Sequence, residues 1–518
     1  MKRITKRYFL NFARFSFIIK GLVLGVIVGV VVSLFRLTIE KMMDFVKWSY
    51  HIMGQKPQYI VLWVGLMIVI SFITGKLIKA DPNIKGSGIP QVEGQLAGEL
   101  EMNWWSVLWR KWIGGVLGIG SGLFLGREGP SIQLGAALGH GFADLTKKRG
   151  SAKRVLIAGG SAAGLSAAFN APIAGTLFVL EEVYHNFSPL IWTTALASAV
   201  SSNYISMNFF GLEPVLKMAP SRVFPLKYYW HLLLVGIFLG LLGLLYQYMT
   251  LNSSKIYDKI KFLPEQYRSI IPLLLIIPIG LFLPLSLGGG NGLIINAVDL
   301  PVGLMTLLGI FVLRIVFSTV CYGTGLPGGI FLPILTLGAI LGAIYGRFMV
   351  DMGLLPQYLV VDFVIYSMSG YFAGIGKAPF TAILLITEMV GSLHHLMPLA
   401  VVTLTAYAVV DLLGGAPIYE AMLSRLLKKD HKEVQGDYSD RLEIPVFAGS
   451  YIQGKQVRDI KWPDTCLLIS IRRGEKDTIP HGDTLIHSGD TLVVLTTHAN
   501  RCHVREKIST ITNKMVEN

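Results

Sequence analysis

Over its first 425 residues the chain alternates between long apolar stretches and short polar or basic connections. Seven of these stretches are long enough to cross about 30 Å of hydrocarbon as helices. They lie near residues 15–35, 58–78, 106–125, 189–210, 229–250, 303–320 and 397–414. Four more are apolar but interrupted by glycine and proline, near residues 126–143, 155–182, 328–349 and 367–390. Because broken helices at membrane depth need protein or a water-filled cavity around them, these four indicate where a polar solute would be handled.

The interrupted stretches are related to one another by an internal repeat. Gly126-Arg-Glu-Gly-Pro130 and the residues that follow share seven positions with Gly329-Ile-Phe-Leu-Pro333 and its continuation, at a constant offset of 203. A second pair of blocks begins at Ala163-Gly164 and Ala373-Gly374, with an offset that changes from 210 to 207. Two ordered blocks at nearly one offset favour duplication over the chance recurrence of small residues at helix contacts. Corresponding interrupted segments in two halves are typical of a transporter binding site.

The composition changes after about Ser424. Residues 426–440 form a charged linker, and residues 441–518 have the pattern of a small soluble domain. That domain has β-like runs at 467–471 and 491–495 and a helical pattern over about 500–509. We therefore expect an all-α polytopic membrane protein with inverted repeats and broken helices over residues 1–425, followed by a small α+β cytoplasmic domain.

Composition and charge narrow the class of protein. Hydrophobic residues make up 52% and charged residues 15% of the chain, and the mean hydropathy of +0.56 excludes a soluble enzyme. The net charge of +14 does not indicate a nucleic-acid partner, because the basic residues occur in short runs between apolar stretches. Basic residues also precede the first stretch, which is too long for a signal peptide, so we expect a cytoplasmic N-terminus.

The sequence offers no pattern for metal or covalent chemistry. Cys321, Cys466 and Cys502 have neither disulfide-framework nor metal-ligand spacing. No nucleophile with an adjacent base stands out either. We therefore expect no metal, no cofactor and no enzymatic activity.

Three of the glycine-containing motifs share a form that suits anion binding. Gly86-Ser-Gly-Ile-Pro90, Gly126-Arg-Glu-Gly-Pro130 and Gly328-Gly-Ile-Phe-Leu-Pro333 each place glycine before a proline that fits the first turn of a helix. An anion at membrane depth has lost its hydration and needs donors in its place. Helix N-termini provide free N–H groups and a positive dipole end without a full countercharge that would trap the ion.

These three motifs and the late Tyr419, in this order, resemble the CLC family of chloride channels and proton-coupled chloride transporters. The resemblance covers about residues 15–425. It implies that Ser87 and Tyr419 face the central anion through their hydroxyls, and that Ile330 and Phe331 contribute backbone N–H groups. Considered singly, Ser87 could equally be an ordinary N-cap and Tyr419 an interfacial aromatic residue.

The resemblance also assigns two glutamates. Glu128 resembles the family's gating glutamate, which competes with the anion when charged and withdraws when protonated. Glu182 matches the internal glutamate that passes protons in the exchangers, and channel members commonly lack it. The structural alternatives are a first-turn acid that complements the helix dipole for Glu128, and a solvated acidic pair with Glu181 for Glu182.

The C-terminal domain resembles a second family. Arg472-Arg473, Ile479-Pro-His-Gly-Asp-Thr484 and His487-Ser-Gly-Asp490 resemble the C-terminal subdomain of RCK proteins, which regulate potassium transport. The resemblance covers about residues 441–510 and implies pairing into dimers and a small regulatory ligand, in some cases cyclic di-AMP. A passive dimerising domain remains the alternative.

Taken together, the residues and the two resemblances predict a homodimeric chloride/proton antiporter of the cell membrane, with both termini cytoplasmic and a pore in each subunit. Chloride, protons and membrane lipid would be its partners. The first alternative is a passive chloride channel on the same fold. A potassium transport protein is the second, although Cys321-Tyr-Gly-Thr-Gly325 lacks the residue order of a potassium selectivity filter.

Overall fold

The computed structural model describes residues 2–216, 218, 223–260, 263–298, 302–430, 439–446, 449–473, 476–497 and 500–513. These residues form two compact units. The first comprises Met1–Glu93 and Met102–Met422, and the second comprises Gly94–Glu101 and Leu423–Asn518.

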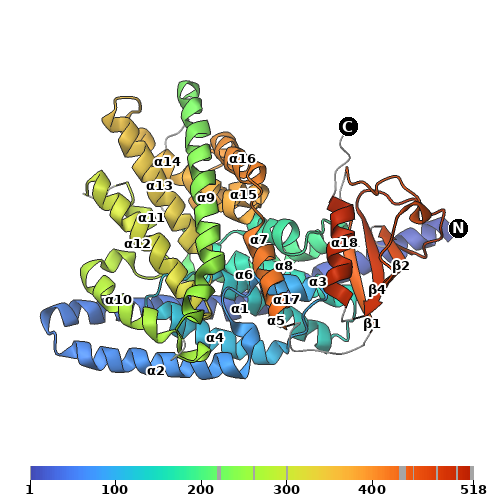
Figure 1. Ribbon diagram of the computed structural model, residues 1–518, viewed down its shortest axis with the longest axis horizontal. Helices are drawn as coiled ribbons and strands as arrows, with labels where there is room; N and C mark the ends of the chain where they lie inside the picture. Colours follow the sequence, from blue (N-terminus) through green and yellow to red (C-terminus); the bar gives the residue numbers. More distant parts are fainter. Residues whose placement is uncertain are drawn as a thin grey trace. The chain divides into compact units, whose positions relative to one another are not determined.

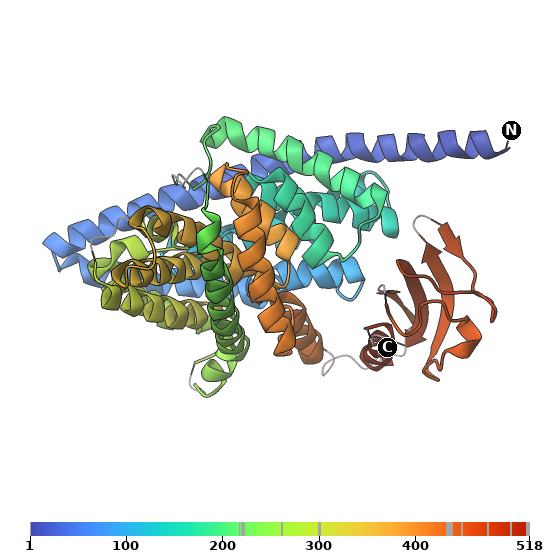
Figure 2. The ribbon, with the colours of Figure 1, turned by 90° about the horizontal axis from the view of Figure 1, so that it is seen from above.

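The first unit is helical (Figures 1 and 2). Its helices, with α3 and α17 running on into the second unit, are α1 (Lys2–Gln55), α2 (Tyr59–Ala80), α3 (Ile89–Ala97), α4 (Trp104–Gly120), α5 (Glu128–Leu145), α6 (Ser151–Phe169), α7 (Pro172–Phe178), α8 (Pro189–Phe210), α9 (Tyr229–Asp258), α10 (Ile270–Phe282), α11 (Asn291–Asn296), α12 (Leu304–Gly323), α13 (Phe331–Asp351), α14 (Val360–Gly376), α15 (Pro379–Val390), α16 (Leu396–Leu412) and α17 (Ile418–Asp430). Within the described residues, seven helical segments are long and apolar enough to cross a membrane. The chain is therefore a multi-pass membrane protein.

Four of the seven predicted apolar stretches lie in segments that qualify as membrane spans, those containing α1, α2, α9 and α12. The other three lie mainly in α4, α8 and α16, which do not qualify. The segment Glu265–Phe282, which contains α10, also qualifies as a span. Two of the stretches predicted to be broken are continuous helices, α5 and α13, each with its proline in the first turn and further glycines along its length. The other two do break: α6 is followed by the separate helix α7, and α14 by α15. After α7 the backbone forms a π-helical turn, η2 (Val179–Val183).

The predicted repeat is visible in the helix boundaries and in the backbone hydrogen bonds. Helices α5 and α13 begin at Glu128 and Phe331, so their starts differ by the same 203 residues as the motifs (331 − 128). The corresponding glycines pair directly, because Gly126 N–H donates to Gly329 C=O and Gly329 N–H donates to Gly126 C=O, both at 2.7 Å. The two repeats therefore meet backbone to backbone at the start of their equivalent helices.

A second reciprocal contact joins the short helices α7 and α15. The Glu181 carboxylate accepts hydrogen bonds from the backbone N–H of Phe380 (3.2 Å) and Thr381 (2.8 Å), at the start of α15. Its repeat mate Glu388 accepts from Ile173 N–H (3.1 Å) and Ala174 N–H (2.8 Å), at the start of α7. Each carboxylate satisfies donors that a helix start leaves unpaired.

The second unit contains a four-stranded antiparallel sheet in the order β1-β4-β2-β3. Its elements are β1 (Ser439–Pro445), β2 (Cys466–Arg473), β3 (Lys476–Thr478), β4 (Asp490–Thr497) and α18 (Arg501–Asn513). A core that includes Leu442, Ile471, Val494 and Val504 joins the sheet to α18. The two predicted strands and the predicted helix are present, and β1 and β3 were not predicted. Of the predicted linker, residues 426–430 continue α17 and residues 431–438 lie outside the described residues.

Candidate anion and proton site

Ser87 lies in a tight loop that is fixed by a buried lysine. The flanking Gly86 and Gly88 have φ angles of +61° and +90°, which favour glycine. The Ser87 Oγ atom accepts a hydrogen bond at 3.2 Å from the N–H of Ile89, the first residue of α3. Lys111, fully buried on α4, donates its Nζ protons to the carbonyls of Ile84 (2.9 Å) and Gly86 (2.8 Å). The loop therefore presents a buried serine at the start of α3.

Glu128 is the first residue of α5 and is fully buried. Neither of its carboxylate oxygens makes a hydrogen bond of standard geometry with a described group, although the backbone N–H groups of Glu128 and Leu332 lie close by. Leu332 is the second residue of α13. The carboxylate thus lies at the start of the repeat-mate helix, in the place where an anion would meet free N–H donors.

The predicted anion ligands come together around the same point. Gly129 is packed so closely on Ser87 that an added Cβ would lie 2.7 Å from the Ser87 carbonyl oxygen. Phe331 starts α13, and its ring lies 5.7 Å from that of Phe178, which in turn lies 6.2 Å from that of Tyr419. Ile330 is the N-cap residue of α13 and is also buried. The Tyr419 hydroxyl is buried and has no hydrogen-bond partner among the described residues.

Glu182 lies in the π-helical turn η2 and is 3% exposed. Three further acids are close enough to interact with it electrostatically: Glu93, Glu181 and Glu420. Tyr419 interacts electrostatically with both Glu182 and Glu128. The Tyr419 phenol is therefore close enough to both glutamates to interact with each of them.

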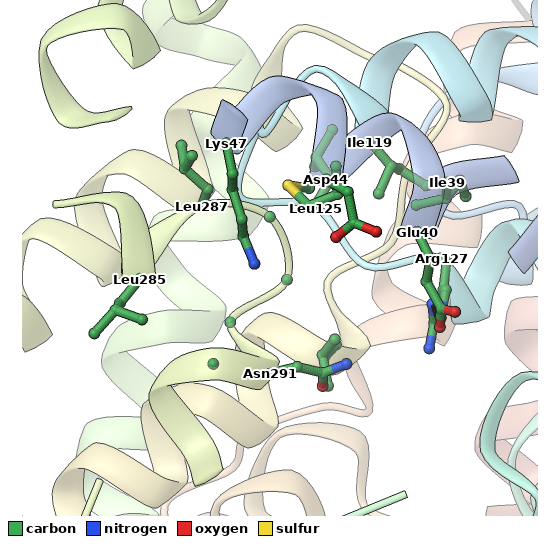
Figure 3. Close-up of a pocket in the computed structure, with 16 residues that line it drawn as sticks. Ile39, Glu40, Asp44, Lys47, Ile119, Leu125, Arg127, Leu285, Leu287 and Asn291 are labelled. Atoms are coloured by element: carbon green, nitrogen blue, oxygen red, sulfur yellow. Dashed lines mark hydrogen bonds and ion pairs between the residues drawn. The ribbon is translucent and has the colours of Figure 1, made fainter. Parts of the chain in front are cut away.

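A cavity of about 190 Å³ is lined in part by Arg127, the neighbour of Glu128 in the chain (Figure 3). Asp44 and Lys47 of α1 line one side, and Asn291 lies across from them. Arg127 and Leu332, which flank Glu128 from α5 and α13, also contribute to the lining. Charged side chains of both signs therefore line a cavity that reaches the neighbours of the buried carboxylate.

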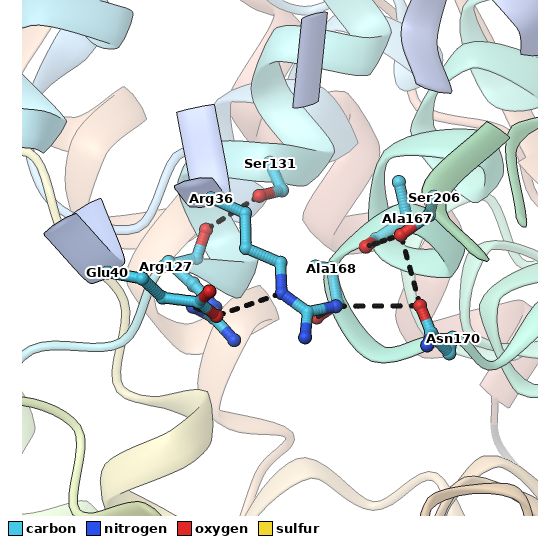
Figure 4. Close-up of polar contacts among 8 residues, drawn as sticks. All are labelled: Arg36, Glu40, Arg127, Ser131, Ala167, Ala168, Asn170 and Ser206. Carbon is cyan, nitrogen blue, oxygen red and sulfur yellow. Dashed lines mark hydrogen bonds and ion pairs between the residues drawn. The ribbon is translucent and has the colours of Figure 1, made fainter. Parts of the chain in front are cut away.

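Two buried arginines share one glutamate next to this cavity (Figure 4). Glu40 Oε1 accepts a hydrogen bond from Arg127 at 2.7 Å and from Arg36 Nε at 3.1 Å. We refer to Arg36, Glu40 and Arg127 as the arginine cluster. Both arginines are 7% exposed, so they retain little contact with solvent.

Sequence reasoning missed several residues that support the site. Lys111 and Arg36 were not singled out, although each is a cation in or beside an apolar stretch, which is itself a signal of function at membrane depth. The hydroxyl of Tyr322, which interacts with Ser87, gave no such signal because tyrosine is common in apolar stretches. Among the described residues no cluster of three or more histidine, cysteine or acidic side chains could hold a metal ion.

The fold and the site together define a multi-pass membrane protein with two repeats whose helix N-termini converge on a buried point. Residues 69–411 match the family model described as voltage gated chloride channel. The chain therefore belongs to that family, the CLC family. Residues 441–509 match the TrkA-C domain, which agrees with the resemblance of this region to the RCK C-terminal subdomain.

Similar proteins and similar solved structures also belong to the CLC family or share its fold. The H(+)/Cl(-) exchange transporter ClcA of Vibrio campbellii is 33% identical over 434 residues, which are 80% of this chain and 91% of that protein. The protein of the same name in Yersinia pestis is 32% identical over 427 residues, which are 79% of this chain and 88% of that protein. The crystal structure of a slow cyanobacterial Cl⁻/H⁺ antiporter matches with a TM-score of 0.74 at 30% identity, over 80% of this chain and 98% of that one. A CLC-type fluoride/proton antiporter has the same fold, with a TM-score of 0.63 at 22% identity over 76% and 95%.

Proposed function

We propose that this protein exchanges chloride for protons across the membrane. The observation that carries the proposal is the Glu128 carboxylate, which is buried beside its own N–H and the N–H of Leu332 at the starts of α5 and α13 and has no hydrogen bond of standard geometry. An anionic side chain in such a position competes directly with an anion in transit. The Vibrio and Yersinia relatives are H(+)/Cl(-) exchange transporters by name, which supports chloride as that anion.

On this proposal, chloride is held by the Ser87 and Tyr419 hydroxyls and by the backbone N–H groups of Ile330 and Phe331. Neutral donors replace part of its hydration without holding the ion too tightly to leave. Protonation of Glu128 removes the competing charge and lets chloride occupy the position of the carboxylate. Deprotonation returns the carboxylate and releases the proton, so one group links the two fluxes.

Protons would reach this point from the other side through Glu182. Its burial and its acidic neighbours suit a group that binds and releases a proton rather than a permanent charge. The position of Tyr419, in electrostatic contact with Glu182 and Glu128, supports a path between them. The presence of Glu182 favours exchange over a passive channel.

Reconstitution of the purified protein in liposomes tests the proposal. A chloride gradient at clamped voltage should drive protons uphill in the wild type. Glu128→Gln should abolish proton movement while some chloride flux remains, and Glu182→Gln should stop proton movement without loss of chloride binding. Glu388→Gln is a matched control, since this glutamate caps α7 but has no proposed part in proton transfer. Chloride flux without proton movement in the wild type would instead indicate the channel alternative.

We also propose that two copies associate through α7 and α15 and their neighbours. Ile173 and Phe380 are equivalent residues at the starts of these helices, and they are 50% and 68% exposed. Trp192 of α8 and Leu404 of α16 add apolar surface, at 42% and 53% exposure. Phe380→Lys should shift the protein toward monomers, measured by light scattering in detergent. An unchanged molar mass would refute this interface.

For the C-terminal domain we propose a regulatory role in the cytoplasm, with both termini on that side of a cell membrane. The TrkA-C match supports a small ligand such as cyclic di-AMP. Calorimetric titration of the whole protein with cyclic di-AMP, and with cyclic di-GMP as control, tests the ligand. Binding of neither nucleotide would favour the passive dimerising role.

A further inference from the structure

Arg36 is an unusual residue for its position. It lies on α1, within a segment long and apolar enough to span the membrane, and is 7% exposed. Its guanidinium is stacked on the ring of Phe210, with Cζ 3.7 Å from the ring centroid. Its NH1 group points to the Ala168 carbonyl and the Asn170 side chain, both at 3.5 Å, at the C-terminal end of α6 (Figure 4). A buried cation at membrane depth is costly unless it has a specific use.

The charges of the arginine cluster do not balance within the cluster. Two guanidiniums and one carboxylate give a net charge of +1 (2 − 1), because Arg36 and Arg127 share the single acid Glu40. An ionised Glu128 brings the sum to zero, and a protonated Glu128 leaves it at +1. The cluster therefore favours either the Glu128 carboxylate or an anion in its place.

Few charged or titratable groups face Glu128. Arg127 on α5 and Arg36 on α1 both interact with it electrostatically. Tyr419 on α17 does so as well, and Glu40 on α1 reaches the site through its pairs with the two arginines. From α13 only backbone N–H groups approach. Among the residues that the structure describes, Arg36 is thus one of two cations that interact electrostatically with Glu128.

We propose that Arg36 is a positioning residue for the gate: it holds Glu40 against Arg127 and supplies half of the positive charge that favours the ionised form of Glu128. This inference rests on the proposed role of Glu128 in gating. Because a nearby cation stabilises a carboxylate relative to the carboxylic acid, Arg36 sets the pH at which the gate releases. Without Arg36, Glu128 should protonate, and chloride flux should rise, at a higher pH.

The pH dependence of chloride flux from liposomes tests the proposal. The midpoint in Arg36→Gln should move toward alkaline pH by about 1 unit, the low end of what an opposite charge does in a protein. Arg36→Lys keeps the charge and should keep the wild-type midpoint. Glu40→Gln removes the only acid of the cluster, so its midpoint should move toward acidic pH. This opposite sign keeps the proposal testable even if Arg36→Gln does not fold.

Arg347→Gln is the matched control. Arg347 also donates to backbone carbonyls, those of Val302, Ala297 and Val298, but it lies 16 residues along α13 from Phe331, about 24 Å at 1.5 Å per residue. Its removal should leave the midpoint unchanged. Glu128→Gln should give a flux without pH dependence in this range.

The outcomes separate this inference from the function on which it rests. If Glu128→Gln keeps the wild-type profile, Glu128 is not the gate and both proposals fail. If chloride flux in Glu128→Gln does not depend on pH but the midpoint of Arg36→Gln equals that of the wild type, the inference about Arg36 fails and the proposed function stands. An equal shift in Arg36→Lys and Arg36→Gln also overturns it, because the effect would then come from packing and not from charge.

Discussion

The reciprocal caps between α7 and α15 lead to a quantitative prediction about stability. Glu388 accepts two backbone hydrogen bonds at the start of α7, and Glu181 accepts two at the start of α15 together with a third from the Thr381 hydroxyl at 2.8 Å. Alanine at either position removes every one of these bonds. It leaves backbone N–H groups of the opposite repeat without an acceptor.

The expected decrease in the free energy of unfolding follows from the number of hydrogen bonds lost. Loss of a capping oxygen typically costs about 1 kcal/mol, with a range of about 0.5–2. We therefore expect Glu388→Ala to cost about 1–2 kcal/mol and Glu181→Ala about 2–3 kcal/mol. Because both caps act on the same contact between α7 and α15, the double variant should cost less than the sum. Thermal unfolding of the purified protein in detergent, followed by intrinsic fluorescence, ranks the variants by stability.

Asp411→Asn provides the comparison. Its ion pair with Lys377 is short, at 2.7 Å, but the aspartate side chain is 57% exposed, and exposed pairs contribute little. The reasoning is refuted if Glu181→Ala and Glu388→Ala unfold at the same temperature as Asp411→Asn. It is also refuted if the double variant shows full additivity, since the caps would then act on independent contacts.

Three further predictions concern single residues. Gly129→Ala would place a Cβ 2.7 Å from a backbone oxygen of the serine loop, and we expect at least a tenfold loss of chloride flux, whereas Gly309→Ala, with no atom within 4 Å of the new Cβ, should keep it. Tyr419→Phe removes a buried hydroxyl that has no described protein partner, so chloride affinity in calorimetric titration should fall about fivefold, as for one lost hydrogen bond. Burial raises the pKa of the Asp490 carboxyl, but hydrogen bonds from Arg473 and from a backbone N–H outweigh it and hold that pKa below its usual value. Its contribution to the stability of the C-terminal domain is therefore present above about pH 4 and is lost as the pH falls through the lowered pKa, and Arg473→Gln should move acid unfolding, followed by limited proteolysis of the whole protein, to higher pH.

The repeat was predictable because its signals are local. Glycine and proline have strong positional preferences at helix starts, so an offset of 203 between two motifs became an offset of 203 between α5 and α13. The strands β2 and β4 were predictable for a similar reason, since apolar β-branched runs between turn residues carry their own signal. The spans that contain α1, α2, α9 and α12 followed from length and hydropathy alone.

What could not be predicted depends on contacts between distant residues. Helix α10 contains Pro272 and Pro278, and a pattern that contains two prolines does not look like a span until neighbouring helices are in place. Glu181 had the appearance of half of an acidic pair, whereas its carboxylate lies at a helix start 200 residues away in the chain. The roles of Ser87, Glu128 and the other site residues stay predictions, although the structure brings them to one place.

The direct pairing of Gly126 with Gly329 has a consequence for how the protein can move. Separation of the two repeats at this point would break two backbone hydrogen bonds of 2.7 Å at a depth where water does not replace them. Each unpaired group would cost several kcal/mol. If the protein exchanges ions as proposed, rocking of the two halves apart at this point would therefore be costly. On that proposal, we expect turnover to involve movements of individual side chains rather than separation of the two halves at this point.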